Sequence, residues 1–144
     1  MDADKASEAR VLFHGCRQVD PAEGVSGARA LCRQAMRASG LEKETLEAEL
    51  LTIVDELGHN ILKYGRAGYI CITVYISGRG RLFRILAEDR GRGIRDLEKA
   101  LEPGFSTGGG LGRGLNLLQA LSDDVRIASL LDGGTRVEVW KAVP

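Results

Sequence analysis

The chain lacks the features that mark several large classes of protein. None of the apolar runs in its 144 residues is long enough to cross a membrane, and the opening Met-Asp-Ala-Asp-Lys-Ala-Ser-Glu has no apolar core of a signal peptide. The formal net charge is zero, which argues against a protein whose main business is coating nucleic acid. We therefore expect a cytosolic protein with no membrane partner and no direct nucleic-acid partner.

Cysteine is also scarce. The three cysteines, Cys16, Cys32 and Cys71, are odd in number, far apart and set in apolar surroundings. This pattern favours reduced core thiols over disulfides or a metal site. His14 is interpreted as the side chain of an edge strand rather than as a metal ligand or a base.

The length and the apolar spacing predict one domain over residues 1–144. We expect helices and strands over these ranges: strand Ala9–Gln18, with Val11 and Phe13 on one face; helices Ser26–Ala38 and Glu42–Tyr64; hairpin strands Tyr69–Ile76 and Leu82–Asp89; a short helix Ile94–Leu101; a helix from about Arg113 to Leu121; and strands Asp124–Leu130 and Thr135–Lys141. The predicted fold class is α/β, as a two-layer α+β sandwich in which helices cover one face of a mixed, mostly antiparallel sheet.

The second helix carries two polar residues beside its apolar stripe. Glu56 and Asn60 are four residues apart, so a carboxylate and an amide face the same point at the margin of the core. Taken alone, such a pair is more often a surface hydrogen-bonded pair than a reacting one. Asp55 and His59 lie further round the helix, toward solvent. Gly58 indicates either close packing or simple tolerance.

A carboxylate ends the second hairpin strand on its buried face. Because the pleat has a period of two, Asp89 emerges on the face that Phe83 and Ile85 bury. A carboxylate there is costly unless it accepts hydrogen bonds from something specific. In the turn that follows, Gly91 and Gly93 would let a flat ligand lie against the main chain.

A glycine-rich stretch from Pro103 to Asn116 runs directly into the leucines of the next helix. A flexible linker would instead run into more polar residues, so this loop opens a helix. Glycines allow close approach of the backbone, and the unpaired N–H groups of a first helical turn attract anions. The stretch therefore favours a phosphate site, although glycine-rich loops before helices are common.

Together these elements resemble a known family. Three segments are similar in order and spacing to the N, G1 and G2 boxes of the GHKL ATPase superfamily, the Bergerat fold. They are Glu56 with Asn60, the run from Asp89 to Gly93, and the run from Gly108 to Gly114. The Gly134-Thr135 pair resembles its further Gly-x-Thr element. Within the superfamily the chain is similar to the small bacterial serine kinases of the RsbW, SpoIIAB and RsbT group, and most similar to the RsbT type.

The resemblance implies ATP and Mg²⁺ as cofactors and gives roles to particular residues. Glu56 would be the catalytic base, Asn60 would hold Mg²⁺, and Asp89 would accept the amino group of adenine. Gly91 and Gly93 would leave room for the adenine ring, and Thr135 would help to fix the adenine end of the nucleotide. The phosphates would be bound by Thr107, Gly108, Gly109, Gly110, Leu111, Gly112, Arg113 and Gly114.

Two positions depart from the family pattern. His59 stands where RsbT-like chains commonly carry Arg, and Arg113 occupies a position often filled by a small residue. Either could change how phosphate is handled. Whether Arg113 pairs with the γ-phosphate or points into water stays open.

The resemblance implies an ATP-dependent protein serine/threonine kinase that phosphorylates STAS-domain partners in a bacterial stressosome or partner-switching pathway. An anti-sigma factor that binds a sigma factor and phosphorylates its antagonist is the alternative within the family. A nucleotide-regulated binding module without turnover is the alternative of another class, and the basic segment from Arg79 to Arg95 keeps a nucleic-acid binder as a further one. A downstream phosphatase as partner and a homodimer are both left open.

Overall fold

The computed structural model describes residues 9–63, 66–90, 111–130 and 133–144, with the backbone alone described at 111–113. The elements are β1 (Arg10–Val19), α2 (Ser26–Ala38), α3 (Glu44–Lys63), β2 (Gly68–Ser77), β3 (Gly80–Asp89), α5 (Leu111–Leu121), β4 (Asp124–Ser129) and β5 (Thr135–Val143). The helix expected over Ile94–Leu101 lies outside the described residues. That the whole chain is one domain stays a prediction.

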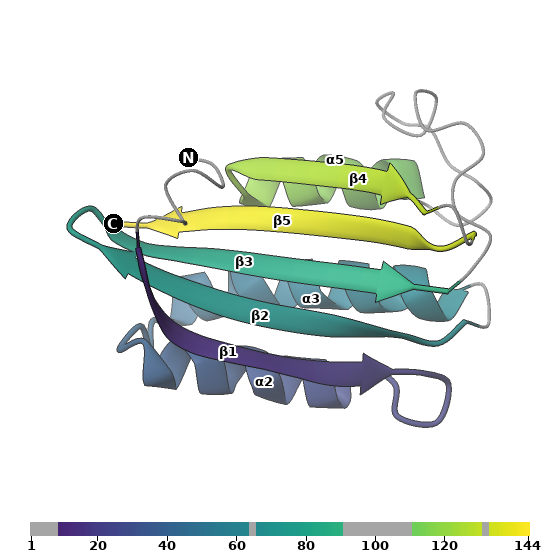
Figure 1. The fold of residues 1–144 in the computed structure, drawn as a ribbon, viewed down its shortest axis with the longest axis horizontal. Helices are drawn as coiled ribbons and strands as arrows, with labels where there is room; N and C mark the ends of the chain where they lie inside the picture. The colour runs from purple at the N-terminus through teal and green to yellow at the C-terminus, as the bar shows by residue number, and fades with distance from the viewer. Residues whose placement is uncertain (1–8, 64–65, 91–110, 131–132) are drawn as a thin grey trace.

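The strands form one sheet in the order β1-β2-β3-β5-β4. All four described pairings are antiparallel, so the sheet that we expected to be mixed, mostly antiparallel, is antiparallel throughout this part of the chain. Helices α2, α3 and α5 lie behind one face (Figure 1). This arrangement confirms the predicted α+β two-layer fold class. None of the described helices combines the length and apolar composition that a membrane span needs.

The core lies between the sheet and the helices. Helix α2 buries the same five residues that its periodicity predicts, Ala28, Leu31, Cys32, Ala35 and Met36. It ends where Gly40 takes a φ of 67° and the amide of Leu41 donates to the carbonyl of Met36 at 2.9 Å, which satisfies one of the last helical carbonyls. The buried stripe of α3 and the inward residues of β2 and β3 complete the core.

The opposite face of the sheet carries a smaller apolar cluster. Trp140 is only 2% exposed and packs with Leu82 on this face. Its ring stacks on Tyr75 at 6.2 Å between centroids, and the Arg84 guanidinium lies 5.5 Å from the ring centroid. Trp140 is therefore covered by packing, as expected from the alternation of β5.

The faces of β1 differ from the prediction. The pairing with β2 shifts register between Val11 and Phe13, so these two residues do not share a face. Phe13 pairs with Val74 and packs against the core, whereas Val11 pairs with Tyr75 and is 52% exposed. The expected common face was wrong because one extra residue in a strand reverses every side chain beyond it.

The cysteine prediction is wrong for two of the three residues. Cys16 and Cys71 are joined by a disulfide, with 4.0 Å between their Cα atoms. They pair directly across β1 and β2 on the face away from the helices, so they are not core thiols. Cys32 alone behaves as expected, because it is a buried free cysteine whose thiol pKa burial raises to about 12.

Gly58 in α3 is required by packing. A Cβ at this position would collide with the Cγ1 atom of Val25, which precedes α2. We therefore expect Gly58→Ala to lower the free energy of unfolding by about 1–3 kcal/mol, although alanine favours a helix by about 1 kcal/mol. Urea unfolding measures the change.

Gly27→Ala in α2 is the matched control. A Cβ at Gly27 would meet only Arg17 atoms, at 3.8 Å or more, which is ordinary contact. We expect the free energy of unfolding to stay unchanged or to rise by up to about 1 kcal/mol. If Gly58→Ala proved as stable as the Gly27 variant, the tight helix contact would not constrain the fold.

Candidate functional site

The residues predicted to form a site come from segments that meet at one end of the sheet. In Figure 1 the chain leaves β3 and α3 at the right-hand end, and it enters α5 and β5 at the same end. Antiparallel pairing produces this arrangement, because the end of one strand lies beside the start of its neighbour. The ends of α3 and β3 and the starts of α5 and β5 therefore lie at one end of the sheet, although these elements are far apart in sequence.

Glu56 and Asn60 lie on one shoulder of α3, both half-buried, where α5 crosses the helix. Gly114 of α5 is buried against them. A Cβ at Gly114 would lie 2.7 Å from Glu56 Oε2 and 3.8 Å from Asn60 Nδ2. Only glycine leaves room there for the carboxylate, so the first turns of α5 and the polar shoulder of α3 form one cluster.

Asn60, whose role as a metal ligand stays a prediction, has an amide that the described residues do not fully satisfy. Its Nδ2 is buried and has no hydrogen-bond partner in the described part of the chain. A buried N–H group that the described residues leave unpaired is costly, so Nδ2 calls for an acceptor oxygen. Being a donor, Nδ2 does not itself coordinate a cation. The amide also supplies a hard oxygen, which is the donor that Mg²⁺ prefers.

Asp89 and Thr135 form a second pair at the same end. They are directly opposite in the register of β3 and β5, and both are half-buried. Glycines surround this point: a Cβ at Gly134 would collide with the Asp89 carbonyl oxygen, and one at Gly68 with the Glu88 carbonyl oxygen. The Asp89 carboxylate and the Thr135 hydroxyl are thus held at a strand end where bulkier neighbours would not fit.

Several predicted residues fall where side chains are not described. Gly91, Gly93, Thr107, Gly108, Gly109 and Gly110 lie outside the described residues, and Leu111, Gly112 and Arg113 are described by backbone alone. The backbone does show that the glycine-rich stretch leads into a helix, as predicted, with α5 beginning at Leu111 rather than near Arg113. The nucleotide-binding roles of these nine residues stay predictions.

Two neighbours of the pair on α3 can be compared with expectation. His59 is exposed, as the helical wheel indicated. Asp55 is instead half-buried and pairs with Arg29 of α2 at 2.5 Å, so it joins the two helices rather than facing solvent. This ion pair raises the pKa of Arg29 through a hydrogen bond and charge attraction. Asp55 thus has a structural partner.

Arg66 belongs to no pattern in the sequence that predicts a site. This residue lies between α3 and β2, at the end of the molecule that holds Asn60 and Asp89. Its Nε is buried and has no hydrogen-bond partner among the described residues. A lone arginine before a strand gives no signal in sequence, because most arginines are exposed.

A family model described as the histidine kinase-like ATPase domain matches residues 18–141. The chain belongs to the histidine kinase-like ATPase family. This is the GHKL superfamily that the motifs resemble, so the family predicted from the sequence is confirmed. ATP binding follows from membership of this family.

Curated relatives narrow the position within the histidine kinase-like ATPases. The serine/threonine-protein kinase RsbT of Bacillus subtilis (strain 168) is 40% identical over 96 residues, which are 66% of this chain and 71% of RsbT. The anti-sigma F factor of Thermoanaerobacter sp. (strain X514) is 31% identical over 102 residues, 67% of this chain and 70% of that protein. The anti-sigma F factor of Anoxybacillus flavithermus (strain DSM 21510 / WK1) is 32% identical over 100 residues, which are 65% of this chain and 67% of that protein. The chain is therefore an RsbT-like histidine kinase-like ATPase, and the expected enzyme class is confirmed at the level of its relatives.

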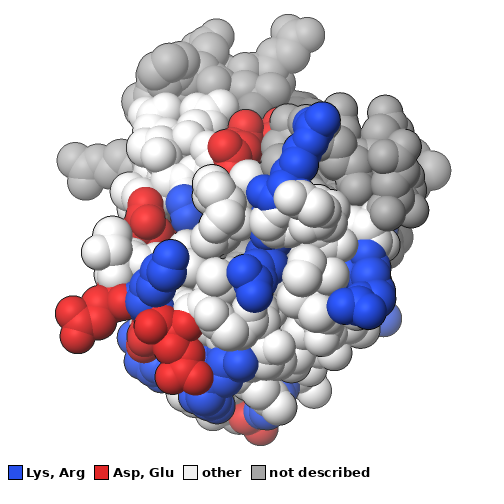
Figure 2. Space-filling view, turned by 90° about the vertical axis from the view of Figure 1, so that its left-hand side faces the viewer, with Lys and Arg blue, Asp and Glu red and all other residues white. Residues whose placement is uncertain are grey.

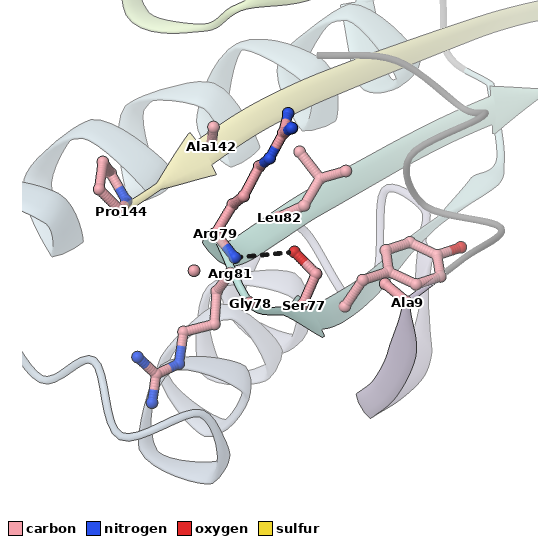
Figure 3. Close-up of a pocket in the computed structure, with 10 residues that line it drawn as sticks. Ala9, Ser77, Gly78, Arg79, Arg81, Leu82, Ala142 and Pro144 are labelled. Atoms are coloured by element: carbon pink, nitrogen blue, oxygen red, sulfur yellow. Dashed lines mark hydrogen bonds between the residues drawn. The ribbon is translucent and has the colours of Figure 1, made fainter.

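A separate cavity of about 470 Å³ lies at the opposite end of the sheet, around the β2–β3 turn and the last residues of β5. None of the predicted site residues lines it. Arg79 and Arg81 do, but their guanidinium groups point to opposite sides (Figure 3), while Ser77 Oγ accepts a hydrogen bond from the Arg79 amide at 3.3 Å. This end carries side chains of both signs (Figure 2). The cationic groups do not converge, so this cavity is not a second phosphate site of the ATPase.

Proposed function

We propose that this chain is an ATP- and Mg²⁺-dependent protein serine/threonine kinase that phosphorylates STAS-domain partners in a stressosome or other partner-switching system. The observation that carries the proposal is the cluster of Glu56, Asn60 and Gly114, which brings a carboxylate and an amide against the start of α5. The substrate class rests on the resemblance and on the kinship with RsbT. A cytoplasmic location and a homodimer stay predictions.

Glu56 has the position of a general base for this reaction. Its carboxylate is half-buried beside the first turns of α5, and the backbone N–H groups of that helix end would face the phosphates. Glu56 would take the proton from the attacking seryl hydroxyl. Asn60 would hold Mg²⁺, which neutralises phosphate charge during transfer. Since phosphoryl transfer depends mainly on positioning and charge, one base and one metal ligand on the same helix suffice.

Asp89 and Thr135 would bind the adenine end. A carboxylate accepts the exocyclic amino group of adenine, and a hydroxyl beside it can donate or accept as the ring requires. Their pairing across β3 and β5 sets the spacing between these two groups, because directly opposite residues of antiparallel strands lie side by side. The base and phosphate ends of the nucleotide would thus be held by different elements.

The test is transfer of label from γ-labelled ATP to purified STAS-domain proteins of the source organism. We expect label on a serine or threonine of one such partner, and loss of transfer when EDTA removes Mg²⁺. Nucleotide binding with no label on any partner would instead identify a binding module. The anti-sigma F relatives favour a second candidate, and ATP-dependent co-elution with a sigma factor would identify it.

Gly114→Ala tests the cluster itself. The new Cβ would lie 2.7 Å from Glu56 Oε2, so the carboxylate must turn away, which a flexible side-chain end does at little cost in stability. We expect phosphoryl transfer to fall by roughly 10- to 100-fold, because small displacements of a reacting group are that costly. Thermal unfolding checks that the fold is retained.

Asn116→Ala on the same helix is the control, since Asn116 is exposed. It should transfer phosphate as the unmodified chain does. Equal rates in the Gly114 and Asn116 variants would show that Glu56 does not act where α5 meets α3.

A further inference from the structure

The sheet face away from the helices holds two cysteines in direct contact. Cys16 of β1 and Cys71 of β2 are register partners, 55 residues apart in sequence, and form a disulfide. They differ in access to solvent. Cys16 lies on an edge strand and is exposed, whereas Cys71 is 8% exposed. One sulfur of the pair is therefore open to an external reagent and the other is shielded.

A histidine lies beside the exposed sulfur. His14 is two residues from Cys16 on β1, so both side chains stand on the same face, and His14 Nε2 lies 3.9 Å from Cys16 Sγ. Nδ1 of the ring lies 2.8 Å from the hydroxyl oxygen of Thr73, its register partner. In the tautomer whose Nδ1–H donates to Thr73, the lone pair of Nε2 faces Cys16. Thr73 thus orients the ring toward the sulfur.

We propose that Cys16 and Cys71 form a reversible thiol–disulfide pair, in which Cys16 exchanges with low-molecular-weight disulfides and His14 accepts its proton. This goes beyond the proposed kinase activity and does not rest on it. The disulfide and the contact with His14 place the reacting groups together. Cys32 provides an internal contrast, because burial raises its thiol pKa to about 12 and it has no cysteine partner.

The exchange proceeds in two balanced steps. In the reduced chain, His14 takes the proton of the Cys16 thiol, and the thiolate attacks one sulfur of a disulfide RSSR. That S–S bond breaks, RS⁻ leaves, and Cys16 carries a mixed disulfide. Cys71 then releases its proton to solvent and attacks the Cys16 sulfur, which expels the second RS⁻. Two protein thiols are oxidised and one RSSR is reduced to two RSH, and excess thiol reverses both steps.

Other charged or titratable groups face this pair from the neighbouring strands. They are Tyr69 and Tyr75 of β2 and Arg84 and Glu88 of β3, and Tyr75 stacks on Trp140. Arg84 and Glu88 are each held in an ion pair with β5. Burial, and then the hydrogen bond with Glu88, raises the pKa of Tyr69, so its hydroxyl stays neutral near pH 7. His14 is therefore the proton acceptor that this part of the sheet offers to Cys16.

The test treats the reduced full-length chain with oxidised glutathione and follows each cysteine by mass spectrometry. We expect the unmodified chain to end as the Cys16–Cys71 disulfide, and Cys71→Ser to keep one glutathione on Cys16. Cys16→Ser should react at Cys71 at least about tenfold more slowly, because that sulfur is shielded. Two persistent free thiols at Cys16 and Cys71, or faster adduct formation at Cys71, would overturn the proposal.

His14→Gln tests the proton acceptor. We expect exchange at Cys16 to slow by roughly tenfold at about pH 7 and to match the unmodified chain above about pH 9.5, where thiolate forms without help. A merely structural role would slow exchange at both pH values and would remove His14 from the mechanism. Exchange in Glu56→Gln at the unmodified rate would show that this chemistry is separate from the nucleotide site.

Discussion

Replacing Glu56 by Gln is expected to lower phosphoryl transfer to a STAS-domain partner by roughly 10²- to 10⁴-fold, the usual contribution of a general base. The amide keeps the shape of the side chain beside Gly114 but cannot take the proton of a seryl hydroxyl. Nucleotide affinity should stay within about threefold, because the base acts on the protein substrate. Single-turnover transfer and calorimetry with Mg²⁺-ATP measure the two quantities.

Glu47→Gln is the matched control on the same helix. Glu47 is partly exposed and pairs with Arg33 of α2 at 3.0 Å, so its replacement removes only a surface ion pair. Transfer by this variant should equal that of the unmodified chain. Transfer by Glu56→Gln at a near-normal rate would exclude Glu56 as the base, whereas a fall in both variants would indicate a general effect of charge.

The second large effect is expected at the adenine end. Asp89→Asn replaces an accepting carboxylate oxygen by an amide that can present a donor to the adenine amino group. Hydrogen bonds to charged groups contribute about 1.5–3 kcal/mol, so nucleotide affinity should fall by roughly 10- to 100-fold. Calorimetry with Mg²⁺-ATP provides the measurement, and phosphoryl transfer at low ATP should fall in parallel.

Glu88→Gln makes the same chemical change one residue earlier. Glu88 points to the opposite face of the sheet, where it pairs with Arg136 at 3.1 Å, so it is remote from any nucleotide bound behind β3. Its nucleotide affinity should stay within about twofold of the unmodified chain. If both variants bound nucleotide normally, Asp89 would not recognise adenine, and the assignment of Asp89 to the adenine end of the nucleotide site would be wrong.

Much of the architecture follows from local patterns. Apolar spacing predicts α2 to the residue and ends β3 at Asp89, because both elements bury one face with a regular period. It also predicts that Glu56 and Asn60 share a shoulder of α3, since four residues make about one helical turn. The antiparallel pairings of β2 with β3 and of β4 with β5 follow from the short turns that join these strands. These are properties of segments, which a sequence displays directly.

Contacts between distant segments could not be predicted in the same way. That Gly114 lies against Glu56, or that Asp55 pairs with Arg29, depends on how helices cross. The β1 bulge and the disulfide depend on register, because a slip of one residue moves every side chain to the other face. The site is therefore visible in sequence as residue types, whereas its packing appears only in three dimensions.

The burial of Trp140 has a practical consequence for experiments on this chain. It is the single tryptophan, so it dominates intrinsic fluorescence. It lies five positions beyond Thr135 along β5, or about 17 Å, on the face that the helices leave uncovered. Its emission therefore reports whether the outer layer of the sheet is intact, which makes it an optical probe of unfolding.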